Sequence, residues 1–218
     1  MSTQPNARST DVAASPLSPF EVASCKKYFL DIESVLRRLP FPVIDRVTEA
    51  LWHAYLEDGT VYVFGNGGSA ALASHCACDL GKGTVVNSNR RFRVIALTDN
   101  VPLMTAWAND ACYDDIFAEQ LAPLIDKADI ALAISGSGNS PNVLKGLHVA
   151  RQAGAFTIGL TGFQGGRIKP LCDLCVIIPS ENMQVIEDLH LSVSHSVFTS
   201  LRARMRATAT PALIRQQA

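Results

Sequence analysis

Two short segments rich in glycine, serine and asparagine contain residue types suited to binding an anion. They are Gly65-Asn66-Gly67-Gly68-Ser69 and Ser135-Gly136-Ser137-Gly138-Asn139-Ser140. Each segment follows an apolar run typical of a strand and precedes a helical pattern, which predicts a turn at a helix N-terminus. Free backbone N–H groups, hydroxyls and the positive end of a helix dipole together bind phosphate well. The two segments therefore predict a protein that handles a phosphorylated small molecule.

The two turns differ in how strongly they indicate a ligand. The first lacks the third glycine of the dinucleotide motif G-x-G-x-x-G, and no Lys-Ser/Thr pair follows it as in a Walker A loop. A glycine-rich turn without a ligand is therefore the alternative for this segment. The second turn brings the hydroxyls of Ser135, Ser137 and Ser140 to one helix start. Ser140 alone would serve as an N-cap, but three serines exceed what capping requires and favour phosphate binding.

A second set of residues is suited to metal binding or acid–base chemistry. His75 and Asp79 are four residues apart in the helix after the first turn, which places them on one face. Glu187 and His195, eight residues apart, also share one side of the last helical pattern. Two imidazoles and two carboxylates are good ligands for a divalent metal such as zinc. If the two helices do not meet, each pair is an ordinary solvated or core pair. His190 lies off the helix face that carries Glu187 and His195, and it is interpreted as a packed core histidine.

The elements that must position these residues are visible as apolar patterns. Five short, nearly continuous apolar runs predict buried parallel strands, with helical patterns between them. The runs are Val61–Phe64, Val94–Thr98, Ile130–Ile134, Thr157–Thr161 and Cys175–Pro179. This alternation predicts the α/β class, with a doubly wound, five-stranded parallel sheet flanked by helices.

Further helices are predicted before and after the sheet. Two amphipathic patterns, Phe20–Leu39 and Pro42–Leu56, are separated near Pro40, and one long helix over about Asn182–Arg206 follows the last strand. The apolar surface of these helices exceeds what a five-stranded sheet can cover. This surplus favours a helix-packed oligomer.

Length and composition indicate one globular domain over residues 20–207. The chain of 218 residues is long enough for one sizeable core. Its 19 basic and 20 acidic residues do not favour a nucleic-acid or membrane partner, and no apolar run is long enough to span a bilayer. Residues 1–19 lack the apolar region of a signal peptide and are predicted to be a disordered tail, and residues 208–218 a frayed one. The six cysteines are interpreted as small buried residues with free thiols in a reducing cytoplasm.

Taken in order, the motifs resemble a known family. The order is Phe64–Ser69 and His75, then Ala108–Asp110, then Ile134–Ser140, and finally Glu187–His190 and His195. Over about residues 20–205 this pattern resembles the sugar isomerase (SIS) domain, and within it the phosphoheptose isomerases. The resemblance implies the SIS fold in a homotetramer with active sites between subunits, often with zinc. It also implies an aldose–ketose isomerase that interconverts sedoheptulose 7-phosphate and D-glycero-D-manno-heptose 7-phosphate.

The resemblance also implies a role for each matched residue. The expected substrate-binding residues are Asn66, Gly67, Gly68, Ser69, Asn109 and Asp110, with Ser135, Ser137 and Ser140 on the phosphate. His75 matches a metal ligand, and His195 matches the histidine that serves as ligand and proton-transfer residue. Two positions depart from the pattern: Asp79 stands where the family has glutamate, and Glu187 where it has glutamine. We expect a metal site of His75, Asp79, Glu187 and His195, with Asp79 or Glu187 as base and His195 as its acid partner.

Two functions without catalysis compete with the isomerase. Some relatives keep the SIS tetramer but bind a replication-initiator protein, and others bind a sugar phosphate as sensors without converting it. The acidic residue at Asp79 and the histidine at His195 are of functional types. These two positions favour the enzyme.

Overall fold

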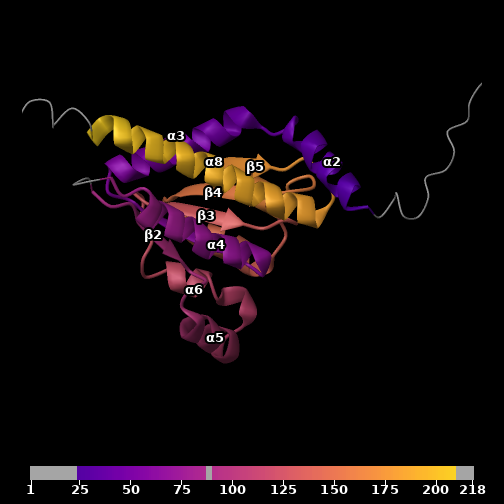
Figure 1. The fold of residues 1–218 in the computed structure, drawn as a ribbon. Coiled ribbons are helices and arrows are strands. Elements are labelled where there is room, and N and C mark those ends of the chain that lie inside the picture. The colour runs from indigo at the N-terminus through magenta and orange to yellow at the C-terminus, as the bar shows by residue number, and fades with distance from the viewer. Residues whose placement is uncertain (1–23, 87–89, 210–218) are drawn as a thin grey trace, which may run out of the picture.

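The computed structural model describes residues 24–86 and 90–209, which form one five-stranded sheet with helices on both faces (Figure 1). The tail predicted over residues 1–19 lies outside the described residues. So do residues 20–23 of the first predicted helix and residues 210–218 of the predicted C-terminal tail.

All five strands are parallel and follow the order β2-β1-β3-β4-β5. They are β1 Thr60–Gly65, β2 Arg93–Ala96, β3 Ile130–Ile134, β4 Phe156–Thr161 and β5 Leu174–Ile177. The five predicted strands are confirmed, with bounds that differ by at most two residues. Beyond β2, the Leu97 N–H still donates to the Val63 carbonyl (2.9 Å), so pairing continues past the end of the strand.

Both faces of the sheet are buried, as the predicted doubly wound arrangement requires. Within β1, Val61 and Val63 contribute to one hydrophobic cluster, whereas Tyr62 and Phe64 contribute to the other. The four side chains are at most 4% exposed. Because neighbouring residues of a strand point to opposite faces, these two clusters are the two halves of the core.

The helices are divided between these faces. Those on the first face contribute to the cluster that contains Val61, and they include the long C-terminal helix, which lies along α3 (Figure 1). They are α2 Cys25–Leu36, α3 Phe41–Leu56, α4 Gly68–Cys78 and α8 Met183–Ala209. The second face carries α6 Ala118–Leu121, α7 Pro141–Gln152 and the 3-10 segments η2 Tyr113–Asp115 and η3 Gly166–Leu171. No helix among the described residues is long and apolar enough to cross a membrane.

Three helical features differ from the predicted pattern. The first helix ends at Leu36, because Leu39 precedes Pro40 and residues before proline avoid the helical conformation. The last helix continues to Ala209, and the Thr208 hydroxyl donates to the Arg204 carbonyl within it (3.2 Å). A π-helical turn, η1 Asp79–Gly83, directly continues α4 and was not predicted.

One helix has almost no place in the core. Helix α5, Val101–Asp110, contains no buried residue and projects from the body of the molecule (Figure 1). Asn100 caps it by accepting a hydrogen bond from the Leu103 N–H (3.1 Å). Only partly buried side chains, those of Met104, Trp107 and Ala108, pack this helix against the second cluster.

The strand order creates a switch point between β1 and β3. The chain passes from β1 outward to β2 and then returns to the opposite side of β1 with β3. Gly65 at the end of β1 pairs with Ile134 at the end of β3. In doubly wound sheets the crevice beyond the carboxyl ends of two such strands is the usual place for a ligand. The two polar turns follow these two strands, so the topology brings them together.

Candidate functional site

A reciprocal pair of amide hydrogen bonds joins the two polar turns. Asn66 Nδ2 donates to Asn142 Oδ1, and Asn142 Nδ2 donates to Asn66 Oδ1, both at 2.8 Å. The Tyr113 hydroxyl also donates to Asn66 Oδ1 (3.1 Å). Asn142 is only 1% exposed and was not predicted as a site residue. Asn142 could have been identified from the sequence as a polar amide next to the apolar stripe of α7, two residues after the serine turn.

The first turn is shaped by its glycines. Gly67 has φ 56°, a left-handed conformation that glycine adopts without cost, and its carbonyl accepts the Ala70 N–H (3.0 Å) to start α4. A Cβ at Gly68 would lie 2.8 Å from Glu187 Oε2, so this glycine leaves room for the Glu187 carboxylate. Ser69 is buried, and its hydroxyl forms no hydrogen bond within the described part of the chain. The turn thus brings a free hydroxyl close to a carboxylate.

The serine turn places two hydroxyls side by side at the start of α7. Ser135 Oγ lies 3.2 Å from Ser140 Oγ. Ser140 occupies the N-cap position, but its side chain makes no capping hydrogen bond. The hydroxyl of Ser137 accepts the Asn139 N–H (3.3 Å), which ties it to the same turn. Simple capping therefore does not account for Ser140, and the hydroxyl pair at a helix N-terminus is suited to an anion.

Two imidazoles and one carboxylate converge where α4 and α8 meet. His75 Nε2 lies 3.2 Å from His195 Nε2, and Asp79 Oδ2 lies 3.4 Å from the first and 3.6 Å from the second. The side chains of His75 and His195 are each 47% exposed and that of Asp79 is 25% exposed, so the group is open to solvent on one side. The prediction that His75 and Asp79 share one helix face is confirmed. We call these three residues the His/Asp triad.

The geometry of the His/Asp triad is suited to a small divalent metal ion. In a tetrahedral site with bonds of about 2.0–2.2 Å, neighbouring ligand atoms lie about 3.3–3.6 Å apart. The three distances in the triad, 3.2, 3.4 and 3.6 Å, are close to that range. Two nitrogen ligands and one oxygen ligand, with a fourth position facing solvent, form the donor set of a catalytic rather than a structural zinc site. The residues therefore fit such an ion.

Glu187 lies close to this group but is not part of it. It lines a cavity of about 220 Å³ together with Gly68, Ser69 and His75. Its carboxylate is not among the ligand atoms that converge in the His/Asp triad. The structure thus puts Glu187 between the first turn and His75, and its predicted role as a metal ligand stays a prediction.

A contact between helices holds α8 beside α2 next to Glu187. The Tyr28 hydroxyl donates to Asp188 Oδ2 (2.5 Å), and this hydrogen bond raises the pKa of Tyr28 to about 12. Asp188 lines the same 220 Å³ cavity as Glu187. Sequence patterns did not indicate this contact, because tyrosine on an N-terminal helix carries no signal for a distant partner.

His190 is a core residue, as predicted. It is fully buried, and its Nε2 lies 3.1 Å from the Thr161 carbonyl, which requires the proton on Nε2. Burial lowers the pKa of His190 to about 4. Its Nδ1 has no partner among the described residues. The imidazole is therefore neutral and fixes the position of α8 against the end of β4.

The predicted pair Asn109 and Asp110 lies at the exposed end of α5. Asn109 Nδ2 donates to Asp110 Oδ1 (2.8 Å), so these two polar groups engage each other. Their predicted role in substrate binding stays a prediction.

The interpretation of the cysteines needs a correction. All six are free, but only Cys76 is buried, whereas Cys25, Cys78 and Cys112 are exposed. Their positions on outward helix faces and at the loop after α5 explain the difference, since a cysteine there has no apolar neighbours to cover it. Cys172 and Cys175 are half-buried, and burial raises the pKa of Cys175 to about 11. Neither thiol of this pair is activated as in a redox motif.

Comparison with known protein families and structures places this fold and site in one class. Residues 27–162 match the SIS domain family. The phosphoheptose isomerase of Pelobacter propionicus is 37% identical over 165 residues, which cover 76% of this chain and 86% of that protein. The solved structure of a phosphoheptose isomerase from Francisella tularensis is 30% identical, with a TM-score of 0.76, and covers 82% of this chain and 96% of its own. The corresponding structure from Neisseria gonorrhoeae has the same TM-score at 26% identity.

The chain is thus a member of the SIS domain family. Within that family it is similar to the phosphoheptose isomerases in sequence and in structure, over most of both chains. It is an isomerase, and the predicted SIS fold is confirmed.

Proposed function

We propose that the chain interconverts sedoheptulose 7-phosphate and D-glycero-D-manno-heptose 7-phosphate. The observation that carries this proposal is the arrangement at the switch point of the sheet. There a pair of hydroxyls at a helix N-terminus follows the end of β3, and a glycine turn with a free hydroxyl follows the end of β1. The cavity beside the glycine turn also contains Glu187 and His75 of the His/Asp triad. We assign these groups as an anion site, a sugar site and a reactive group.

The phosphate of the substrate binds at the serine turn. The hydroxyls of Ser135, Ser137 and Ser140 donate to phosphate oxygens, assisted by the positive end of the α7 dipole. The sugar then extends toward the first turn, where Asn66, Ser69 and the backbone of Gly67 and Gly68 contact its hydroxyls. Asn109 and Asp110 are proposed as further substrate contacts from α5.

A divalent metal, zinc by the donor set, is held by the His/Asp triad. When bound, such an ion polarises a substrate oxygen as a Lewis acid. Glu187 is the fourth proposed ligand, or it remains free as a base. Its position beside Gly68 and outside the His/Asp triad supports the second role.

The reaction moves one proton between two carbons and one between their oxygens. We assign the first transfer to Glu187, which takes the proton from C1 of the ketose and returns it to C2. His195 acts as its acid partner for the proton that passes from the C1 hydroxyl to the C2 oxygen, through the ring nitrogen that does not bind the metal. Asp79, in contact with both imidazoles, holds them in place.

The working form is proposed to be a cytoplasmic homotetramer. The exposed apolar side chains of the N-terminal helices and of α5 support association with further copies, because soluble monomers seldom expose so many. A site between subunits would also complete the open side of the His/Asp triad.

A direct assay tests the proposed function. The purified chain, loaded with zinc, is expected to convert sedoheptulose 7-phosphate to the aldose, detected by chromatography. His195→Ala, shown to be folded by circular dichroism, is expected to lose at least a hundredfold in kcat. Sugar-phosphate binding without turnover in the wild type would instead indicate a sensor. If the wild type binds no sugar phosphate and contains no metal, the result would indicate the protein-binding alternative.

A further inference from the structure

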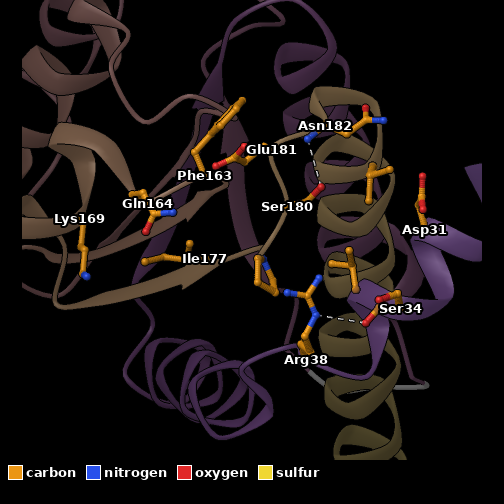
Figure 2. Close-up of a pocket in the computed structure, with 13 residues that line it drawn as sticks. Asp31, Ser34, Arg38, Phe163, Gln164, Lys169, Ile177, Ser180, Glu181 and Asn182 are labelled. Carbon is orange, nitrogen blue, oxygen red and sulfur yellow. Dashed lines mark hydrogen bonds between the residues drawn. The ribbon is translucent and has the colours of Figure 1, made fainter. Parts of the chain in front are cut away.

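A cavity of about 710 Å³ lies apart from the proposed active site, between α2, the end of β5 and the start of α8 (Figure 2). It shares no lining residue with the 220 Å³ cavity beside the first polar turn. Its volume is in the range of cavities that bind small metabolites. No step of the proposed isomerase reaction uses it.

Two cations from different elements face this cavity. Arg38 extends from the turn after α2 and Lys169 from η3, on either side of Ile177 in the view of Figure 2. Within residues 24–86 and 90–209 neither side chain forms an ion pair, and the Arg38 Nε reaches only the Ser34 carbonyl, at 3.4 Å. Of the two acidic residues in the lining, Asp31 is paired with Lys27 (3.0 Å). The free charge of the cavity is therefore positive, which favours an anion.

Two further polar side chains of the cavity are of types that bind sugar hydroxyls. Glu181 and Gln164 present a carboxylate and an amide that form no hydrogen bond within the described chain. Carboxylates and amides accept hydrogen bonds from hydroxyl groups, and an amide also donates. A ligand with one phosphate and several hydroxyls satisfies all of these side chains, whereas an inorganic anion satisfies only the cations.

The rim of the cavity is held in a conformation that costs energy. Phe163 has φ 50°, which a bulky residue rarely adopts. Its N–H donates to the Ser180 carbonyl (3.0 Å), which joins the loop after β4 to the segment before α8. Backbone strain of this kind persists mainly where a binding site requires it.

We infer that this cavity is a second binding site for a phosphorylated sugar. Its phosphate binds at the Arg38 side of the cavity, its hydroxyls contact Glu181 and Gln164, and Lys169 adds positive charge from the opposite side. The inference does not depend on the proposed isomerase activity, because it concerns binding alone.

Calorimetric titration of the full chain with glucose 6-phosphate tests this second site. The background is Ser137→Ala with Ser140→Ala, which weakens the first phosphate site. We expect one molecule bound per chain, with affinity at least tenfold above that of inorganic phosphate and no binding of glucose. Adding Arg38→Gln and Lys169→Gln is expected to lower the affinity at least tenfold. The matched control, Arg37→Gln with Lys127→Gln, removes two cations that do not line the cavity and is expected to leave binding unchanged.

Three results would overturn the inference. They are no binding of glucose 6-phosphate, an equal affinity for inorganic phosphate, or an equal loss of affinity in the Arg37→Gln, Lys127→Gln control. If the background variant does not fold, the wild-type chain provides the same test. It is expected to bind one molecule per chain more than the Arg38→Gln, Lys169→Gln variant. A single molecule bound by both proteins would contradict a second site.

Discussion

In the proposed mechanism, two side chains at separate positions divide the acid chemistry of the site. Asp79 contacts both imidazoles of the His/Asp triad, while the Glu187 carboxylate lies against Gly68. The family pattern that the sequence resembles is expected to have the longer acid at the first position and an amide at the second. In the structure each carboxylate lies beside the groups of its proposed role, Asp79 beside the imidazoles and Glu187 beside the first turn.

This division predicts the outcome of restoring the family pattern. Glu187→Gln removes the proposed base and is expected to lower kcat about 10²–10⁴-fold, the usual contribution of general base catalysis. Adding Asp79→Glu supplies an acid with one more methylene and is expected to recover at least tenfold of that loss. Steady-state kinetics on sedoheptulose 7-phosphate measures both steps.

Metal content provides the control for this pair of variants. Glu187→Gln is expected to retain the zinc content of the wild type, measured by mass spectrometry of the dialysed protein. Full activity in Glu187→Gln, or a loss of metal that parallels the loss of activity, would show that Glu187 is not the base.

A second prediction concerns His190 and the dependence of stability on pH. The pKa of His190 is about 4 in the folded chain, against 6.5 for an ordinary histidine. Between these values the unfolded chain binds a proton that the folded chain does not, so the free energy of unfolding decreases as the pH falls from 6.5 to 4. The contribution is a few kcal/mol, at about 1.4 kcal/mol per pH unit. His190→Gln is expected to flatten this part of the profile, measured by urea unfolding at several pH values.

The other histidines titrate in both proteins, so the difference between the two profiles isolates His190. Parallel profiles for the wild type and His190→Gln over pH 4–6.5 would contradict the assignment of a neutral, buried imidazole.

Among helices and strands, the sequence patterns predicted most of the scaffold but not its contacts. The strands were found because buried parallel strands are continuous apolar runs, and β3 has the predicted bounds. The π-helical turn after α4 was missed, since Gly81 and Gly83 in its sequence suggest only a loop. Asn142 was missed because its partner lies 76 residues away. Periodicity reports which face of an element is buried, not which polar group on another element it meets.

The amide pair between the two turns leads to a prediction for the elements that it joins. Asn142→Ala leaves the Nδ2 group of the half-buried Asn66 without its acceptor and is expected to cost about 1–3 kcal/mol of stability. A double-mutant cycle with Asn66→Ala is expected to give a coupling energy of about 0.5–3 kcal/mol, measured by urea unfolding. The control is His148→Ala, which changes an exposed residue on the same helix. Additive effects of the two asparagine variants would show that the pair does not couple the turns.

At the scale of the whole molecule, one region lacks a partner within the described chain. Ile95 on β2 is 43% exposed, Val101 is 59% exposed and Leu103 is 39% exposed, and α5 has no buried residue. An edge strand with an exposed apolar side chain is a site for association. The proposed homotetramer is expected to cover this region.

Light scattering coupled to size-exclusion chromatography tests the expected assembly. The wild-type chain is expected to elute as four copies, and Val101→Lys with Leu103→Lys as a smaller particle, because buried charges oppose association. Leu124→Lys, at an exposed position outside this region, is the control and is expected to remain a tetramer. A single-chain mass for the wild type would contradict the assembly, and an unchanged mass for the double variant would contradict this interface.

The position of α8 at the end of the chain has a consequence for biosynthesis. Its apolar side chains, among them Ile186, Leu189 and Leu201, close the first face of the sheet, and His195 completes the His/Asp triad. A ribosome adds about 5–20 residues per second, so for one or more seconds the nascent chain has all five strands but lacks the part of that face's cover that α8 supplies. During this interval the emerging chain exposes apolar surface that α8 later buries. The proposed activity, which requires His195, is therefore expected only after the last helix is made.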